Sequence, residues 1–306
     1  MSSSQITLSN GEQHSIRTVH LREQVSKFVQ DFSVNNDISI ASTSELCTIY
    51  MEKRDQFISP RPRNVHIMET FSPRSDGRRK KFLDIVLDRI SRGEDITANL
   101  SPRVFRSFEI GEKSRGISWK NRDLALNFYD IHHLHIDDMD KSYKRSRNFP
   151  DLIWGHFTRN DFYAIYWGDH DSLKDEKFIA SIATFWDTQG YGLHGICPSR
   201  SVLAAQERQL LQRYGFSPPL ANENNFVGSG IAAMAGNSLR HQAHLVRCFR
   251  YMRDKEKAIN DGQTVEASLG INVDATKPEW VWAFDHCDLV IMDKISRRAG
   301  VCVPWR

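Results

Sequence analysis

The chain has 306 residues, 40% of them hydrophobic and 26% charged, and a formal net charge of +3 at pH 7. These values are ordinary for a soluble globular protein with room for two domains, and they permit a polyanionic partner without requiring one. No apolar run approaches the roughly 18 residues of a membrane span, and the polar start lacks the apolar core of a signal peptide. Five widely spaced cysteines without a CxxC pair argue against a disulfide framework or a zinc ribbon. We therefore expect a cytoplasmic protein with reduced thiols and no membrane partner.

Residues 1–75 are predicted to form an appended helical region. Apolar residues recur at the spacing of one helix face at Val25, Phe28, Val29 and Phe32. Ser42 followed by Glu45 has the pattern of a capping box that opens a second helix. The proline-containing stretches 59–63 and 73–77 then break regular structure, which predicts a domain boundary near residue 75.

An amphipathic helix is predicted from Arg78, with Gly93 just past its end. Its first turn carries the densest basic run in the chain, which consists of Arg78, Arg79, Lys80 and Lys81. Such a run is usually a solvated helix end, but cations at a helix N-terminus oppose the macrodipole. This mismatch favours an anionic partner, so we predict that the four side chains contact a nucleic-acid backbone.

The most chemically loaded stretch is residues 129–140, YDIHHLHIDDMD. Its apolar and β-branched residues give it the character of a strand. Because side chains alternate between the two faces of a strand, one face is expected to carry His133, His135 and Asp137. The opposite face would carry His132, Leu134 and Ile136. His132 is therefore expected in the core or behind the site.

A basic loop and a hairpin follow the histidine strand. The loop, residues 141–147 (KSYKRSR), contains Lys141, Lys144, Arg145 and Arg147. Aromatic-rich runs at 152–157 and 162–167 flank a polar turn, which is a good hairpin signal, and His170 closes the second run. Helix, strand and hairpin together predict a small α+β domain over residues 76–171.

Residues 172–306 are expected to form a mixed α/β C-terminal domain. Residues 178–185 fit a helix or a strand, whereas 280–284 and 289–292 alternate like a terminal pair of strands. The glycine segment 228–238 resembles an anion-binding helix start, although a packing loop is the commoner use of such a sequence. The next helix is predicted to bury Leu239, Ala243, Val246 and Phe249. Its other side would form a phosphate track of Arg240, His244 and Arg247.

The face with His133, His135 and Asp137 suits a metal centre on chemical grounds. Imidazole and carboxylate bind Zn, Fe, Mn or Ni, and neighbouring positions on one strand face can chelate. Further ligands would come from the hairpin, where the nearest candidates are His156, Asp169 and His170. No metalloenzyme spacing such as HExxH is present. A metal-dependent hydrolase or oxygenase is therefore the alternative rather than the first hypothesis.

The first hypothesis is metal-free cleavage of RNA, which needs no cofactor. Transphosphorylation requires a base for the 2′-hydroxyl proton, an acid for the leaving 5′-oxygen and cations for the phosphorane charge. Histidine can serve in both proton roles near neutral pH, and arginine or lysine stabilises the charge. His133 and His135 lie just before the basic loop, whose cations would attract phosphate and repel a metal. A histidine cluster without chemistry is the remaining interpretation.

The central stretch also resembles a group of bacterial proteins over about residues 80–170. The resemblance rests on GEDITANLSPRV, on DLALNFYDIHHLHI, on a basic Arg-Ser pair and on FYAIYWGDH. These proteins carry a GIHHLHL-type strand, and their core is likened to the RelE/barnase type of toxin ribonuclease. The resemblance places the group's functional residues on His133, His135, Arg145 and His170. This sequence departs from the pattern at Tyr129-Asp130, where Trp-Gly is commoner, and at IWGHF, which replaces an apolar LLF run.

Together these observations predict an α+β protein in which a RelE/barnase-like nuclease domain lies between helical N- and C-terminal regions. We expect His133 and His135 as general base and acid, in either order, with Arg145 as phosphorane stabiliser and His170 as a supporting proton donor. The other basic side chains would hold the RNA backbone. The resemblance implies a toxin or phage-defence context, with an antitoxin or other defence protein as partner. A non-catalytic nucleic-acid-binding component of a defence system is the third hypothesis.

Overall fold

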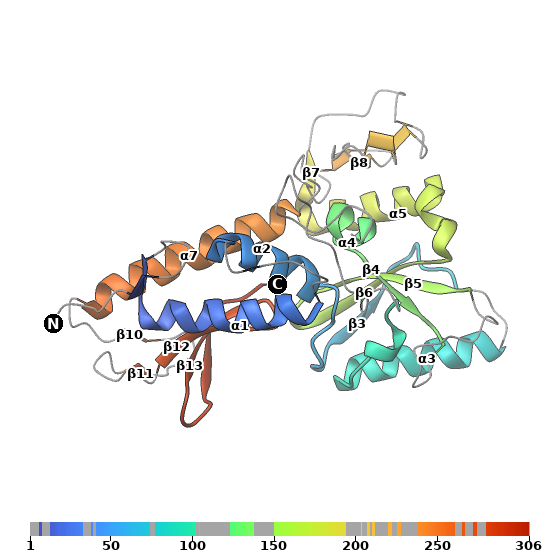
Figure 1. Cartoon of the computed structure of the whole chain (residues 1–306). Coiled ribbons are helices and arrows are strands. Elements are labelled where there is room, and N and C mark those ends of the chain that lie inside the picture. The colour runs from blue at the N-terminus through green and yellow to red at the C-terminus, as the bar shows by residue number, and fades with distance from the viewer. Residues whose placement is uncertain are drawn as a thin grey trace. The chain divides into compact units, whose positions relative to one another are not determined.

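The computed structural model describes residues 6–7, 13–32, 38, 41–73, 77–101, 104, 123–137, 150–193, 203, 207–208, 210–211, 220–221, 225–227, 238–260, 265–266, 272–273 and 280–305. These residues form two compact units (Figure 1). Unit 1 takes its described residues from 6–55 and 241–305, and unit 2 takes them from 56–240. Helices and strands occur in both, which confirms the expected mixed α+β class. Within the described residues, no helix is long and apolar enough to cross a membrane.

Unit 1 packs helices against an antiparallel sheet in the order β12-β13-β14. The helices are α1 (Ile16–Phe32), α2 (Thr43–Arg54) and α7 (Leu239–Asn260), whose first two residues belong to unit 2. The strands are β12 (Trp280–Asp285), β13 (Asp288–Asp293) and β14 (Ala299–Val303). Two short antiparallel pairs complete it: β1 (Ile6–Thr7) with β2 (Gln13–His14), and β10 (Val265–Glu266) with β11 (Asn272–Val273). The capping box of Ser42 and Glu45 is confirmed at the start of α2.

One apolar core joins the two ends of the chain in unit 1. Its buried members include Val25 of α1, Leu46 of α2, Leu245 of α7, and Trp282 and Ile291 of the sheet. These distant segments bury one another, and the chain passes from one unit to the other after residues 55 and 240. The boundaries predicted near 75 and 171 instead fall inside unit 2.

Unit 2 is built on a four-stranded sheet in the order β3-β6-β5-β4. Its strands are β3 (Asn64–Ile67), β4 (His132–His135), β5 (Leu152–Phe157) and β6 (Asp161–Gly168). β4, β5 and β6 are antiparallel neighbours, so the predicted histidine strand and hairpin are confirmed. β3, which pairs in parallel with β6, has no counterpart among the predicted elements.

Helices cover both faces of this sheet (Figure 1). α3 (Gly77–Arg92) lies on one face, where its apolar stripe packs with Leu134 and Ile153. α4 (Leu124–Tyr129) and α5 (Glu176–Trp186) lie on the other, around Trp154. The helical form of α5 decides the open choice at residues 178–185. The short elements of unit 2 are η1 (Thr97–Asn99), η4 (His170–Lys174), the π-helical turn η5 (Asp187–Tyr191), β7 (Gly192–Leu193), β8 (Leu220–Ala221) and β9 (Phe226–Val227).

Gly155 permits a close approach between β5 and β6. The pairing of these strands shifts register between Trp154 and Gly155. A Cβ atom at residue 155 would lie 2.4 Å from the Phe162 ring and 2.6 Å from the Tyr163 carbonyl oxygen. The absence of a side chain here therefore lets β6 lie against the part of β5 that also pairs with the histidine strand.

We expect Gly155→Ala to lower the free energy of unfolding by about 1–3 kcal/mol, because the added methyl group overpacks the contact between two central strands. Gly77→Ala is the matched control, since nothing lies within 4 Å of a Cβ atom at that position. Urea unfolding of both variants measures the difference. Equal stabilities would contradict the close contact.

Candidate functional site

The pairing of β4 with β5 sets the direction of each histidine in the strand. His133 opposes Trp154 and His135 opposes Leu152. The rings of His133 and His135 share one face, with centroids 6.0 Å apart. His132 is buried on the opposite face, where its ring meets that of Phe157 edge-on. The alternation expected for these three histidines is therefore the one the structure has.

His170 joins the two strand histidines from a second segment. Its ring centroid lies 5.5 Å from that of His133 and 5.3 Å from that of His135. The register explains this convergence, because Leu152 of β5 opposes His135 on one side and Gly168 at the end of β6 on the other. We call His133, His135 and His170 the histidine cluster.

The backbone around His170 is held by a capping box. The Asp169 carboxylate accepts a hydrogen bond from the Asp171 N–H, at 2.9 Å, and the Asp169 N–H donates to Ser172 Oγ, also at 2.9 Å. These two bonds satisfy the start of η4 and fix the turn after β6. The third histidine is therefore placed by ordered backbone.

Asp123 is a candidate functional residue that sequence reasoning missed. It caps α4, where its Oδ1 accepts a hydrogen bond from the Leu126 N–H at 3.1 Å. Its Oδ2 lies 3.5 Å from Nδ1 of His133. A carboxylate at this position favours a proton on Nδ1 and leaves Nε2 of His133 for proton transfer. The available signal was an aspartate at the N-cap of the short helix that leads into the histidine strand.

The cluster is partly shielded from solvent. The His133 side chain is 14% exposed, His135 is buried and His170 is exposed. Trp154 supports His133, with ring centroids 5.2 Å apart, and is itself packed on Phe178 of α5. Such a site has a rigid aromatic support and an open side next to His170, which suits proton exchange with a bound substrate.

Several predicted site residues fall outside the described part of the chain. They are Lys141, Lys144, Arg145 and Arg147. The residues on either side of this stretch are described: Asp137 follows β4, and Asp151 precedes Leu152, the partner of His135. The chain therefore leaves and re-enters the sheet at the end that carries the histidine cluster. Most of the glycine segment 228–238 also lies outside the described residues.

The four basic side chains at the start of α3 have different surroundings. Arg79 Nε lies 3.0 Å from Oδ2 of the buried Asp151, so this guanidinium neutralises a carboxylate of the fold. Arg78, Lys80 and Lys81 are exposed. Lys80 and Lys81 line a shallow groove together with Asp84 and Asp88, whose carboxylates offset part of the positive charge. This helix end is thus less positive than the sequence alone suggests.

Arg240 also has an internal partner. Its guanidinium forms an ion pair with the buried Asp130 and lies 4.6 Å from the centroid of the Trp186 ring. Asp130 ends α4 in a left-handed conformation, with φ of 56°, and its carbonyl lies 2.9 Å from Nδ1 of the buried His156. Arg240 therefore compensates a buried charge within unit 2. It does not lead a row of phosphate ligands.

His244 was predicted to bind nucleic acid, and this prediction is wrong because the side chain is fully buried. Its Nε2 lies 2.9 Å from the Cys287 carbonyl oxygen, and Arg247 Nη2 lies 3.2 Å from its Nδ1. Burial lowers the pKa of His244 from 6.5 to about 4. With Nδ1 accepting from Arg247 and Nε2 donating to Cys287, the ring is held neutral.

The predicted inward face of α7 is right at Phe249, which packs against the core, and wrong at its other three positions, including the exposed Ala243. Leu239 is 38% and Val246 57% exposed, whereas Leu245, Cys248 and Met252 lie in the core. The buried face of this helix includes histidines, so apolar spacing alone selects the wrong side.

The metal hypothesis has no geometric support in the described residues. Among them, no group of three His, Cys, Asp or Glu side chains is arranged to hold a metal ion. His133, His135 and Asp137, with the hairpin candidates His156, Asp169 and His170, are all described.

Comparison of the chain with protein-family models, with curated proteins and with solved structures finds no match. The chemistry of the site must therefore be argued from its own residues.

We expect stability to fall as the pH drops from about 6.5 towards 4, in part because His244 is protonated in the unfolded chain but not in the folded one. The contribution of this one residue across that range is about 3 kcal/mol. His244→Gln keeps an amide that can donate to the Cys287 carbonyl and removes the titration. Urea unfolding at several pH values should show a flatter pH dependence for the variant. Parallel curves for variant and wild type would contradict a neutral buried His244.

Proposed function

We propose that unit 2 is a metal-independent endoribonuclease of toxin or phage-defence type. The observation that carries the proposal is the convergence of His133, His135 and His170, whose ring centroids lie 5.3 to 6.0 Å apart. A histidine cluster at a partly open position, with a carboxylate behind one ring, is suited to moving two protons on one substrate. Cleavage of RNA by its own 2′-hydroxyl is a reaction that needs only such proton transfer and charge stabilisation.

The proposed reaction is transphosphorylation within the RNA. One strand histidine takes the proton of the 2′-hydroxyl, and the 2′-oxygen attacks the adjacent phosphorus. The bond from phosphorus to the 5′-oxygen breaks, and the second strand histidine protonates that oxygen. The products are a 2′,3′-cyclic phosphate and a 5′-hydroxyl, so atoms and charge balance without water or metal. His133 and His135 serve as base and acid in either order, and His170 supports the proton transfer.

Asp123 has a positioning role in this scheme. It favours the Nδ1 proton of His133 and stabilises the imidazolium form through the 3.5 Å contact. Such a carboxylate orients the ring and matches its charge during the reaction, which is a general use of an aspartate beside a catalytic histidine. The same residue caps α4, so local backbone structure and the site share one side chain.

The positive charge required by the phosphorane is assigned to the basic loop. Arg145 is the proposed stabiliser, and Lys141, Lys144 and Arg147 are proposed to hold the backbone. Support comes from the described residues on either side of the loop. Asp137 lies two residues after His135, and Asp151 lies directly before Leu152, the partner of His135 at the cluster end of the sheet. Cations near this end would attract phosphate and disfavour a bound metal ion.

The resemblance over residues 80–170 supports the same proposal and supplies its biological context. It implies a RelE/barnase-like core for unit 2 and a restraining partner such as an antitoxin or defence protein. A cytoplasmic location agrees with an RNA substrate and with the four described cysteines, which are all free. The proposed core type, partner and location all depend on the nuclease activity.

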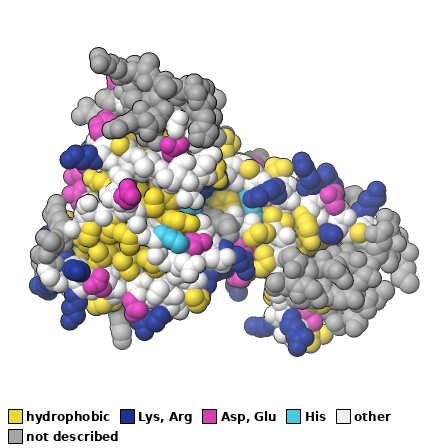
Figure 2. All heavy atoms as spheres, turned by 180° about the vertical axis from the view of Figure 1, so that it is seen from behind, with side chains coloured by type: hydrophobic (Ala, Val, Ile, Leu, Met, Phe, Trp, Pro, Cys, Tyr) yellow, Lys and Arg dark blue, Asp and Glu magenta, His cyan; other side chains and the backbone are white. Residues whose placement is uncertain are grey.

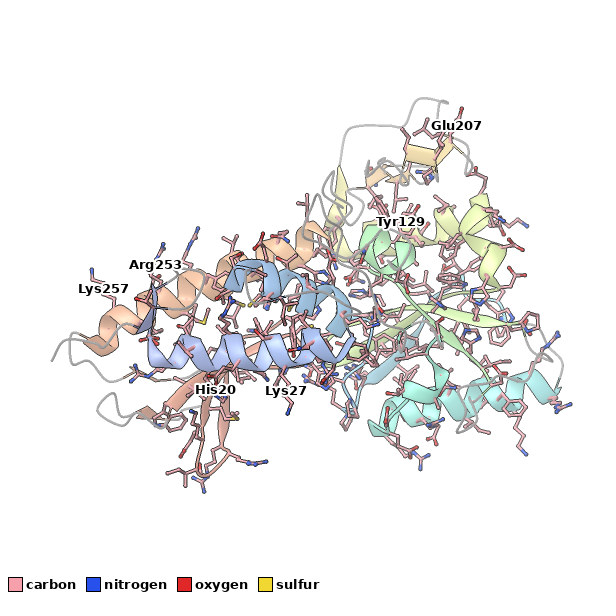
Figure 3. All side chains as sticks on the ribbon, viewed as in Figure 1. His20, Lys27, Tyr129, Glu207, Arg253 and Lys257 are labelled. Atoms are coloured by element: carbon pink, nitrogen blue, oxygen red, sulfur yellow. The ribbon has the colours of Figure 1, made fainter. Side chains whose placement is uncertain are left out.

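We expect the double variant His133→Ala/His135→Ala to cleave RNA about 10²–10⁴-fold more slowly than wild type in the presence of EDTA, because both proton-transfer groups are lost. His20→Ala is the matched control, since His20 is a partly exposed histidine of α1 in unit 1 (Figure 3). The measurement is the initial rate of cleavage of a labelled single-stranded RNA by purified protein. RNA degradation at the wild-type rate by the double variant would rule out this mechanism.

Asp123→Asn tests the positioning role separately. Asparagine retains an oxygen for the Leu126 N–H but removes the charge beside His133, so we expect about a tenfold loss in rate with the fold intact. The limb of the pH–rate profile that reports His133 should move to lower pH, because the imidazolium form loses its partner. A lower rate with an unchanged pH profile would show that Asp123 serves only to cap α4.

A further inference from the structure

The exposed side of α7 carries a row of cations, of which the sequence pattern singled out only Arg247. Its members are Arg247, Arg250, Arg253 and Lys257, all exposed. They recur at intervals of three, three and four residues, so they follow one side of the helix over about 15 Å. Lys and Arg side chains gather over this helix in Figure 2, and Figure 3 shows Arg253 and Lys257 pointing outward from it. We call these four residues the α7 ridge.

The ridge is fixed in place by the other side of the helix. Leu245, Cys248 and Met252 are buried in the core of unit 1, and His244 is anchored to the Cys287 carbonyl. The helix therefore cannot rotate without opening that core. The cations are held on a rigid support, as a surface for binding an extended partner requires.

The positive charge of the ridge is only partly offset by the described residues around it. Asp254 lies 3.6 Å from Arg253, but the two side chains are 64% and 76% exposed, so water screens the pair. Glu256 is directed inward, where it accepts hydrogen bonds from Arg17 at 3.3 Å and from Trp282 Nε1 at 2.8 Å. Like charges three and four residues apart destabilise a helix. The ridge keeps four such cations along about three turns, at a cost to the stability of the helix.

We propose that the α7 ridge binds the phosphate backbone of single-stranded RNA. Three of its four cations are arginines, whose planar guanidinium groups can bind phosphate through two hydrogen bonds. A membrane surface fits less well, because an amphipathic helix binds lipid through a wide exposed apolar face, and the apolar face of α7 is buried in the core. The proposal rests on the exposure and charge of unit 1 and does not depend on the cleavage chemistry of unit 2.

The test uses the full-length His133→Ala/His135→Ala protein, so that the RNA stays intact. Binding of a labelled single-stranded 20-nucleotide RNA is followed by fluorescence anisotropy at several salt concentrations. Arg250→Gln/Arg253→Gln/Lys257→Gln is expected to weaken binding about tenfold or more at low salt. It should also reduce the slope of log affinity against log salt by about 2, since three phosphate contacts are lost.

The matched control is Lys27→Gln/Lys294→Gln/Arg298→Gln, which removes the same charge from exposed positions elsewhere in unit 1. It is expected to change affinity and slope much less than the ridge variant. Equal effects of the two triple variants would overturn the proposal and show a response to net charge alone. The proposal would also be overturned if the ridge variant bound RNA as well as its parent but no longer bound vesicles of phosphatidylserine and phosphatidylcholine. That result would identify a membrane surface as the partner.

Cleavage of a dinucleotide distinguishes an error in the RNA-binding proposal for the ridge from an error in the nuclease proposal. A dinucleotide has a single phosphodiester, which would occupy the cleavage centre and leave no backbone phosphate for the ridge. Its cleavage by the ridge variant in an otherwise wild-type chain should therefore match that of wild type. Loss of dinucleotide cleavage in that variant would contradict a separate binding surface.

Discussion

The site depends on the register of β4 against β5. Leu134 is fully buried on one side of β4, so the strand can place its apolar residues in the core in only one way. That choice turns His133 and His135 to the opposite side, next to Trp154, where His170 joins them. A slip of one residue would put Leu134 in their place and His133 in the core. The burial of Leu134 on one face of β4 therefore determines that His133 and His135 lie on the other face.

Histidine by itself does not mark a functional site in this chain. His132 lies in a core, His156 is held by the carbonyl of Asp130, and His244 is held neutral between Arg247 and Cys287. All three are buried. His133 and His170 differ because their rings lie side by side, with His133 partly exposed and His170 exposed to solvent.

Local patterns predicted local structure well. The capping box of α2, the amphipathic α3, the histidine strand and the hairpin all have signals within a few residues, and each is present. Features set by distant partners could not be predicted in this way. The pairing of β3 with β6 and the core shared by the chain ends need contacts across most of the sequence. The approach of Asp123 to His133 likewise depends on the turn after α4. In α7 the buried face includes His241 and His244, so the spacing of apolar residues did not identify it.

The most direct test of the account is the chemical nature of the RNA ends. Purified protein in excess EDTA is incubated with a single-stranded RNA, and the products are identified by mass spectrometry. A second substrate carries a 2′-deoxy nucleotide before the cleaved linkage. Transphosphorylation by the histidine cluster predicts 2′,3′-cyclic phosphate and 5′-hydroxyl ends, with no cleavage at the deoxy position. Ends bearing a 5′-phosphate, or equal cleavage of the two substrates, would contradict histidine-catalysed transphosphorylation.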